Sequence, residues 1–320
     1  MHSLIIGGAG FIGSNLTDYL LNEGNKVTII DNLSRGSTDN LKFYLENNNL
    51  NFINRDVSNL QNCKLAFLDA SRDISIDEVW HLAANSDIPA GVSNPDIDLK
   101  DTFLTTFNIL ICMKELSIKI INFASSSAIY GDFKDVIINE DIGPLLPISN
   151  YGAMKLASEA QISAASESFL QRANIFRFPN VVGVPATHGV ILDFVQKLKR
   201  NINKLEVLGD GSQCKSYLHV SDLIDAMFVI RKKPSNSKIM LVNIGPLDMG
   251  VNVKWIAEQV VSKISPNAKI IYGIGNKGWV GDVPKFNYST NKLQSFGWAP
   301  KLNSKDAILL SINQIINENQ

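Results

Sequence analysis

The first 31 residues constrain the fold more than any other part of the chain. A short apolar run, Ser3 to Ile6, leads into the turn Gly7-Gly8-Ala9-Gly10-Phe11-Ile12-Gly13, and an amphipathic helical pattern follows to about Glu23. Gly24-Asn25 ends that pattern, and a second apolar run, Lys26 to Ile30, brings Asp31 to its end. Strand, glycine turn, helix, strand and acid in this order predict a parallel βαβ unit that binds a dinucleotide.

Three glycines of the turn have a physical task in such a unit. Gly7 permits the tight turn, Gly10 lets the backbone approach a pyrophosphate, and Gly13 lets the helix pack on the strand. The helix opens at Phe11 and Ile12, so its N-terminus faces the phosphates, where the peptide dipoles favour negative charge.

Asp31 bears on which dinucleotide is bound. It follows Gly13 at close to the spacing of roughly 20 residues that places an acid on the adenosine ribose. Its carboxylate can accept hydrogen bonds from a ribose diol but would repel a 2′-phosphate, which favours NAD over NADP. Arg35, in the next loop, leaves two readings open, a cation near the ribose or a solvated loop charge.

The alternation of strands and helices continues and predicts a doubly wound parallel sheet. Its ligands are expected where the strands end, at Asp56 and Val57, at Leu82-Ala83-Ala84 and at the serines Ser125 to Ser127. The predicted strands are 50–53, 78–83, 119–124 and 174–178, and the predicted helices are 95–116 and 151–171.

The rhythm changes after residue 178. Helices are expected over 188–200, from a Ser221-Asp222 cap to about Arg231, and over 253–265, with extended pieces at 205–208, 216–220 and 238–244. A glycine-rich loop at 278–284 and two short helices complete the chain. We therefore expect a dinucleotide-binding domain over 1–178, joined again by a strand and helix near 218–245, and a smaller α/β lobe over 179–320.

Composition excludes some partners. The chain has 320 residues, 45% of them hydrophobic, and a net charge of −1, which argues against a nucleic-acid or anionic-membrane surface as the main partner. Cys63, Cys112 and Cys214 show no pairing or metal-binding pattern, so no metal is expected. With no leader pattern and no apolar run of membrane-spanning length, we expect a cytoplasmic protein.

Tyr151 and Lys155 suggest the chemistry, since residues four apart share one face of a helix. A nearby ammonium lowers the pKa of a phenol, and a serine hydroxyl beside the phenol can hold a substrate alcohol for deprotonation. Such a site removes a proton from a sugar or alcohol hydroxyl while a nicotinamide accepts the hydride. The alternative is a surface helix with a solvated Lys.

These motifs together resemble the extended short-chain dehydrogenase/reductase family, and within it the NAD-dependent nucleotide-sugar epimerases and dehydratases. The resemblance includes the glycine turn, the segment Asp31-Asn32-Leu33-Ser34-Arg35-Gly36, Tyr130-Gly131 after the serines, Tyr151 with Lys155, and the loop from Gly278 to Pro284. It implies bound NAD and 4-epimerisation of a nucleotide sugar of the UDP-glucose/UDP-galactose type.

The resemblance also implies roles for single residues. Ser126, four residues before Tyr130, would be the catalytic serine, Tyr151 the base, and Lys155 the residue that holds the nicotinamide ribose. Asn32, Ser34, Arg35 and Gly36 would line the NAD site, and Phe178 would flank the nicotinamide. The implied substrate-binding residues are Ser126, Ser127, Tyr151, Asn180, Lys215 and Asp282.

Three positions depart from the family pattern and leave open which nucleotide sugar is preferred, but not the class of chemistry. Lys215 and Trp279 stand where relatives have Arg, and Thr102 where Asn is common. A 4,6-dehydratase or decarboxylase would need an acid two positions after the serine, which here is Ala128. Epimerisation of UDP-N-acetylglucosamine or UDP-glucuronate also fits the pattern, and a non-catalytic NAD-binding regulator is the reading that involves no reaction.

The resemblance further implies a homodimer that pairs through a four-helix bundle, formed by the helices predicted over 95–116 and 151–171.

Overall fold

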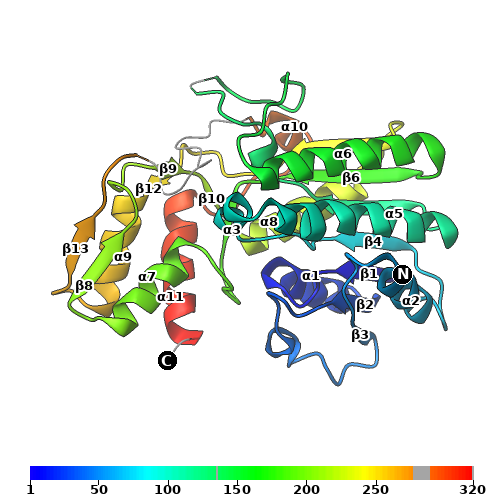
Figure 1. The fold of residues 1–320 in the computed structure, drawn as a ribbon, viewed down its shortest axis with the longest axis horizontal. Helices are drawn as coiled ribbons and strands as arrows, with labels where there is room; N and C mark the ends of the chain where they lie inside the picture. The colour runs from blue at the N-terminus through cyan, green and yellow to red at the C-terminus, as the bar shows by residue number, and fades with distance from the viewer. Residues whose placement is uncertain (135, 277–288, 319–320) are drawn as a thin grey trace.

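The larger part of the molecule, to the right in Figure 1, is built around a sheet of seven parallel strands, whose order is β11-β6-β5-β4-β1-β2-β3. The computed structural model describes residues 1–134, 136–276 and 289–318. This strand order confirms the predicted doubly wound, Rossmann-type sheet. Its strands are β1 (His2–Ile6), β2 (Lys26–Asp31), β3 (Leu50–Asn54), β4 (Glu78–His81), β5 (Ile120–Ala124), β6 (Arg172–Arg177) and β11 (Ile239–Asn243).

Helices cover both faces of the sheet because the strands are apolar on both sides. One face packs against α2 (Leu60–Ala70), α5 (Thr105–Glu115) and α6 (Asn150–Ser168). The other packs against α1 (Phe11–Asn22) and α8 (Val220–Lys232). The sheet is therefore the middle of three layers, with Ile121 and Phe123 buried on one face and Trp80 and Phe176 on the other.

The helix predicted over 95–116 is three segments. After α3 (Ile88–Ser93), the chain forms α4 (Pro95–Asp98), a π-helical turn (Leu99–Leu104) and then α5. Thr105 Oγ1 donates to the carbonyls of Asp101 and Thr102, and Thr106 Oγ1 also donates to the Thr102 carbonyl. Hydroxyl groups that bond to helix carbonyls compete with the backbone ladder, which accounts for the wider turn here.

The cap predicted for α8 was wrong. His219 caps the helix, because its side chain accepts a hydrogen bond from the Ser221 backbone N–H, and Asp222 lies inside the first turn. Asp222 instead accepts hydrogen bonds from the N–H groups of Lys301 and Leu302 and so ties α8 to the C-terminal segment.

Beyond β6 the chain builds a smaller cluster of elements, which lies to the left of the sheet in Figure 1. Its apolar core contains Phe194, Leu205, Ile256 and Ile312. The strand pairs are β7 (Asn180–Val182) with β10 (Tyr217–His219), β8 (Lys204–Val207) with β13 (Lys269–Tyr272), and β9 (Cys214–Lys215) with β12 (Val251–Asn252), and the helices are α7 (Val190–Arg200), α9 (Val253–Ile264) and α11 (Ser304–Glu318). The short helix α10 (Asn291–Gln294) lies instead beside the large sheet (Figure 1), where Leu293 joins the core that packs against α1 and α8.

Several of these elements were not predicted, and one was longer than expected. The sequence patterns missed α2, α3 and the strands β7, β9, β12 and β13, and α11 is a helix of 15 residues where a short one was expected. The strand β11 returns to the large sheet and pairs in parallel with β6. We keep the boundary near residue 178 as a proposal. None of the helices in the described ranges combines the length and apolar character needed to cross a bilayer.

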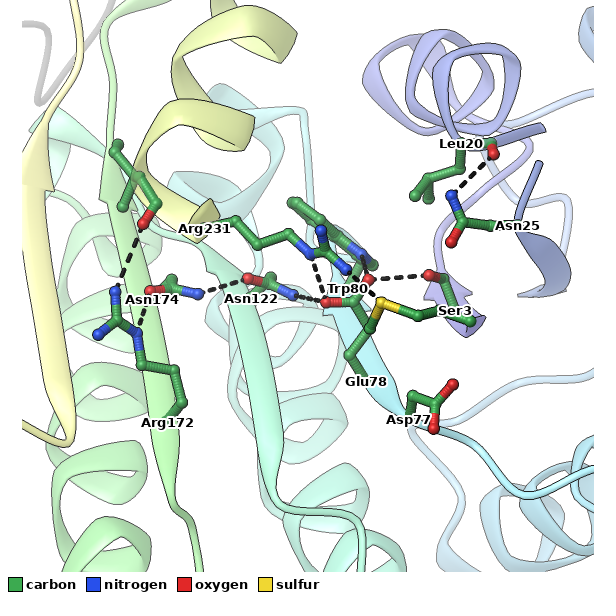
Figure 2. A network of polar contacts seen from close by, with 12 residues as sticks. Ser3, Leu20, Asn25, Asp77, Glu78, Trp80, Asn122, Arg172, Asn174 and Arg231 are labelled. Carbon is green, nitrogen blue, oxygen red and sulfur yellow. Dashed lines mark hydrogen bonds and ion pairs between the residues drawn. The ribbon is translucent and has the colours of Figure 1, made fainter. Parts of the chain in front are cut away.

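A buried carboxylate joins the sheet to α8. Glu78, 1% exposed, accepts hydrogen bonds from Ser3 Oγ, Trp80 Nε1, Asn122 Nδ2 and Arg231 Nε at 2.7–3.0 Å. Figure 2 shows these groups gathered around Glu78, with Asn174 and Arg172 extending the network across β6. Both oxygens of the carboxylate have partners, so this buried ion pair fixes the relative position of β1, β4, β5 and α8.

Glu78→Ala should lower the free energy of unfolding by about 3–5 kcal/mol, because it leaves the Arg231 guanidinium and the buried donors without their acceptor. Urea unfolding followed by circular dichroism measures the change. Glu23→Gln is the control, since Glu23 pairs with Lys232 on the surface at 3.6 Å and its loss should change little. Equal effects of the two substitutions would contradict the role given to Glu78.

Candidate active site at the carboxyl edge of the sheet

The predicted cofactor residues lie at one edge of the sheet, where the parallel strands end. The glycine turn follows β1, the segment Asp31 to Gly36 follows β2, Asp56 and Val57 follow β3, and Leu82 to Ala84 follow β4. The N–H groups of Leu82 and Ala83 both donate to the Ile6 carbonyl, at 2.9 and 3.0 Å, which holds the β4 loop against the glycine turn.

The turn has a shape that only glycine allows at Gly13. A Cβ atom there would lie 2.2 Å from the Gly7 carbonyl oxygen and 2.6 Å from the Gly8 Cα. The absence of a side chain therefore lets α1 pack directly on the turn, as predicted.

Gly10 differs, because its φ of −79° is ordinary and a Cβ there would meet only the Gly7 oxygen, at 3.4 Å, among the described residues. The fold would accept alanine at this position, so the glycine leaves room beside the N-terminus of α1. That room fits a dinucleotide pyrophosphate held by the helix N-terminus that opens at Phe11 and Ile12.

Asp31 lies beside this turn and is 8% exposed. Its carboxylate accepts hydrogen bonds from the Ala9 N–H at 2.9 Å and the Leu33 N–H at 2.8 Å. Burial raises the pKa of Asp31, and these two hydrogen bonds oppose that rise. Each oxygen keeps one lone pair, which suits a ribose diol.

The loop after β2 folds back over the glycine turn. A Cβ atom on Gly36 would lie 2.7 Å from the Ala9 carbonyl carbon. Ser34 N–H donates to the Asn32 side chain, and Arg35 forms an ion pair with Asp87 at 2.8 Å. The Arg35 guanidinium is therefore neither a free solvated charge nor directed only at the ribose site. It pairs with a carboxylate that follows β4.

Ser126, Tyr151 and Lys155 converge after β5. Lys155 is 2% exposed, its Nζ donates to the Ala124 carbonyl at 2.6 Å and lies 5.8 Å from the centre of the Tyr151 ring. Ser126 Oγ accepts a hydrogen bond from the Ala128 N–H at 3.1 Å and lies close enough to the Tyr151 phenol to lower the pKa of that phenol as a hydrogen-bonding neighbour. Ser149 caps α6 and so sets where Tyr151 sits in the first turn of the helix.

Burial dominates the electrostatics of this pair. It raises the pKa of Tyr151 to about 12, against the lowering effect of the Ser126 hydrogen bond. It lowers the pKa of Lys155 to about 7, against the opposite effect of Glu159. Both shifts favour the neutral form of a buried group, so the site needs charge from a bound molecule or a pH change to create the phenolate.

The three serines have different surroundings. Ser125, 1% exposed, donates to Glu159, whereas Ser127 is 7% exposed and its N–H donates to the Phe178 carbonyl at 3.1 Å. Ser126 is the partly exposed one of the three, and its hydroxyl faces Tyr151. Phe178 is thereby held next to the serine run.

The predicted substrate residues are less tightly gathered. Asn180 begins β7 and pairs in register with Tyr217, two residues after Lys215 in β9. Asp282 and Trp279 lie outside the described residues. His81 is fully buried and its Nε2 contacts the Thr106 hydroxyl at 2.9 Å, so it is a packed strand residue.

Sequence reasoning missed Glu159 and Arg177. Arg177 donates to both carboxylate oxygens of Glu159, from Nε at 3.0 Å and Nη2 at 2.6 Å, directly behind the serine run. The position of Glu159, four residues after Lys155 on the same helix face, was the available signal.

This fold and this edge define a Rossmann-type dinucleotide-binding protein. More particularly, the chain belongs to the NAD dependent epimerase/dehydratase family, whose sequence profile matches residues 3–245. NAD is therefore its cofactor, as predicted from Asp31.

Similar proteins are found along the whole chain. A putative UDP-glucose 4-epimerase of Methanocaldococcus jannaschii is 30% identical over 99% of both chains. A crystal structure of a UDP-galactose 4-epimerase, 33% identical, superposes over 100% of both chains with a TM-score of 0.86. UDP-glucuronic acid decarboxylase 1 of Danio rerio is 30% identical over 75% of this chain and 56% of the relative.

Gly10→Ala should weaken NAD binding at least about tenfold while the apoprotein keeps its thermal stability, since the methyl group enters the space beside α1 and not the packed turn. Calorimetric titration with NAD and thermal melting measure the two effects. Gly13→Ala is the matched control and should destabilise the apoprotein itself. Unchanged NAD affinity in Gly10→Ala would contradict this placement of the pyrophosphate.

Proposed function

We propose that the protein catalyses NAD-dependent 4-epimerisation of a nucleotide sugar of the UDP-glucose/UDP-galactose type, through a transient 4-keto intermediate. The observation that carries the proposal is the convergence of Ser126, Tyr151 and Lys155 at the cofactor edge, with Ala128 in place of an acid. The names of the M. jannaschii relative and of the similar crystal structure support the same reaction type.

The glycine turn, Asp31 to Gly36 and the loops after β3 and β4 would hold NAD along the edge of the sheet. NAD, when bound, accepts a hydride from the sugar carbon and returns it. Lys155 would bind the nicotinamide ribose, and Phe178, held beside the serines, would pack against the nicotinamide.

Tyr151 acts as the base that takes the proton from the sugar 4-hydroxyl, and Ser126 orients that hydroxyl. A phenol with a pKa of about 12 is scarcely ionised at neutral pH, so positive charge close to the ring is required for turnover. Lys155 supplies it when protonated, and Tyr151 returns the proton after the sugar has turned.

Ser127 and Asn180 would line the sugar and diphosphate site, with Asp282 as a further substrate contact. Lys215 would meet the diphosphate as a point charge, because an ammonium lacks the bidentate fork of an Arg.

Elimination and decarboxylation are the main competing reactions, and one of the similar proteins is a decarboxylase. Both reactions use a further acid or base near the serine. Position 128, where related enzymes of those kinds carry an acid, is Ala here. Epimerisation of UDP-N-acetylglucosamine or UDP-glucuronate needs no such acid and stays closer to the proposal, while a non-catalytic NAD-binding regulator would not need Ser126, Tyr151 and Lys155.

The test is a panel of nucleotide sugars followed by NMR, with no cofactor added. The expected result is interconversion of UDP-glucose and UDP-galactose or of a close analogue pair, with no stoichiometric accumulation of reduced NAD. A product that is only a 4-keto-6-deoxy sugar or a pentose would overturn the epimerase proposal.

Tyr151→Phe is the matched control for this panel. It removes one oxygen atom and should reduce turnover by about 10²–10⁴-fold or more, because the proton acceptor is lost, while NAD stays bound. Near wild-type turnover in this variant would remove Tyr151 from the mechanism.

We also propose a cytoplasmic homodimer that pairs through the helices of 95–116 and α6. Leu99 and Phe107 are 42% and 40% exposed on this side of the molecule, and Phe103 stacks on Phe107 at 6.5 Å. Two such helix pairs would form a four-helix bundle across a two-fold axis.

Light scattering at micromolar concentration should give the mass of two chains, and Phe107→Glu should shift that mass toward one chain. A monomer in the unmodified protein would contradict the dimer.

A further inference from the structure

The face of α6 that carries Tyr151 and Lys155 has a third member. Glu159 lies one further turn along the same face, 6% exposed. Base, cation and anion therefore follow each other at four-residue spacing, and only the first two are used in the proposed reaction.

Glu159 is paired with an arginine in a geometry that permits little movement. Two parallel hydrogen bonds join its carboxylate to Arg177, and both side chains are less than 10% exposed. Removing two charges from water is costly, and a buried ion pair often adds no net stability over an apolar pair. The two hydrogen bonds from the Arg177 guanidinium do, however, hold the Glu159 carboxylate in one orientation. They thereby fix the position of any other group that this carboxylate binds.

What the carboxylate also binds is the serine run. Ser125 Oγ donates to Glu159 Oε1 at 2.5 Å, on the residue next to Ser126. The backbone around Ser126 is held on both sides, since Lys155 binds the Ala124 carbonyl and the Ser127 N–H donates to the Phe178 carbonyl. The residues that hold the serine run therefore lie on two elements. Lys155 and Glu159 are on α6, and Arg177 and Phe178 are at the end of β6.

The pair is also fixed from behind. Arg177 Nη1 donates to Tyr130 Oη at 2.9 Å, and Tyr130 donates in turn to Asn243 Oδ1 at 2.6 Å. Burial raises the pKa of Tyr130 to about 12, so it stays a neutral phenol that both accepts and donates. Asn243 ends β11, so the network connects the serine run to the edge strand of the sheet.

We propose that Glu159 and Arg177 form a positioning pair that holds the serine run through the Ser125 hydroxyl and thereby keeps the Ser126 hydroxyl against Tyr151. The inference rests on the roles given to Ser126 and Tyr151 in the proposed function. Neither Glu159 nor Arg177 touches the substrate in this assignment, and Ser125 is a structural link and not a second catalytic serine.

The charged groups around Tyr151 stay the same when Ser125 is changed. Lys155 lies on its own helix, and Asp98 from α4 and the Ser126 hydroxyl act on the phenol from other elements. His81, from β4, lies near Lys155, and burial keeps the pKa of that imidazole well below its usual range, so it is neutral. Glu159 keeps its two bonds to Arg177. A change at Tyr151 would therefore come from a displaced Ser126.

Ser125→Ala is the variant that tests this. It removes one hydroxyl and leaves the ion pair in place. The matched control is Ser166→Ala, since Ser166 is also 1% exposed but its hydroxyl bonds, among the described residues, only to the Ile162 carbonyl of its own helix. In the NAD-loaded protein, kcat should fall at least about tenfold in Ser125→Ala with KM within about threefold, and remain unchanged in Ser166→Ala.

The pH profile adds a readout that a merely structural role would not move. The Ser126 hydrogen bond lowers the pKa of Tyr151, so its loss raises that pKa. The limb of the kcat profile that rises with pH should then shift to higher pH in Ser125→Ala. Arg177→Lys, which keeps the charge but loses the fork, should change kcat and the profile in the same direction.

A substrate-free measurement separates this proposal from the proposed function. Tyrosine labelled with ¹³C at Cζ is introduced into the NAD-loaded protein, and the resonance absent from Tyr151→Phe is that of Tyr151. This resonance should move in Ser125→Ala and stay in place in Ser166→Ala. If it stays in place in both, or if both variants lose activity equally, the positioning pair is refuted. If the unmodified protein turns over no nucleotide sugar, the proposed function fails, and the resonance still decides the role of Glu159 and Arg177.

Discussion

All seven strands of the large sheet run in the same direction, and this constraint determines where chemistry can occur. Parallel strands need a crossover between each pair, so every strand ends at the same edge and every connecting helix begins there. The glycine turn, Asp31, the serine run and the start of β7 come from distant parts of the sequence. They lie close together because each lies at or follows the carboxyl end of a parallel strand. The helix N-termini at the same place favour the phosphates of a dinucleotide.

Two buried carboxylates have arginine partners, Glu78 at the amino end of β4 and Glu159 on α6, whose partner Arg177 ends β6. Glu78 and Arg231 join α8 to the strands away from the candidate active site (Figure 2), whereas Glu159 and Arg177 lie directly behind the serine run. Both carboxylates accept hydrogen bonds from a serine as well. The Glu78 network fixes the relative positions of the strands and α8. The Glu159 network binds Ser125, so a small displacement of Glu159 would also move Ser126.

The sequence was sufficient for features whose cause is local. The glycine turn, the strand β2 ending in Asp31 and the helix that carries Tyr151 and Lys155 each depend on residues close together in the chain, and their positions could be predicted within a few residues. The role of Glu159 could not, because its partner Arg177 lies on another element and only the fold brings the two together. The π-helical turn before α5 was also hidden, since it arises from threonine hydroxyls that compete for carbonyls and not from any break in the apolar pattern. The His219 cap was missed for a similar reason, because Ser and Asp are the usual capping residues and stood next to it.

The return of β11 to the large sheet has a consequence for how the chain is made. Among the described strands, β11 alone pairs with β6 on that side of the sheet, and it is reached only after the chain has built β7, α7, β8 and α8. A chain still being synthesised, or one cut near residue 178, would present β6 as an open edge, with its N–H and C=O groups free to pair with another molecule. The dinucleotide-binding half is therefore not a separable fragment. Its last strand arrives late, so the protein has to complete much of its second half before the first half is protected from aggregation.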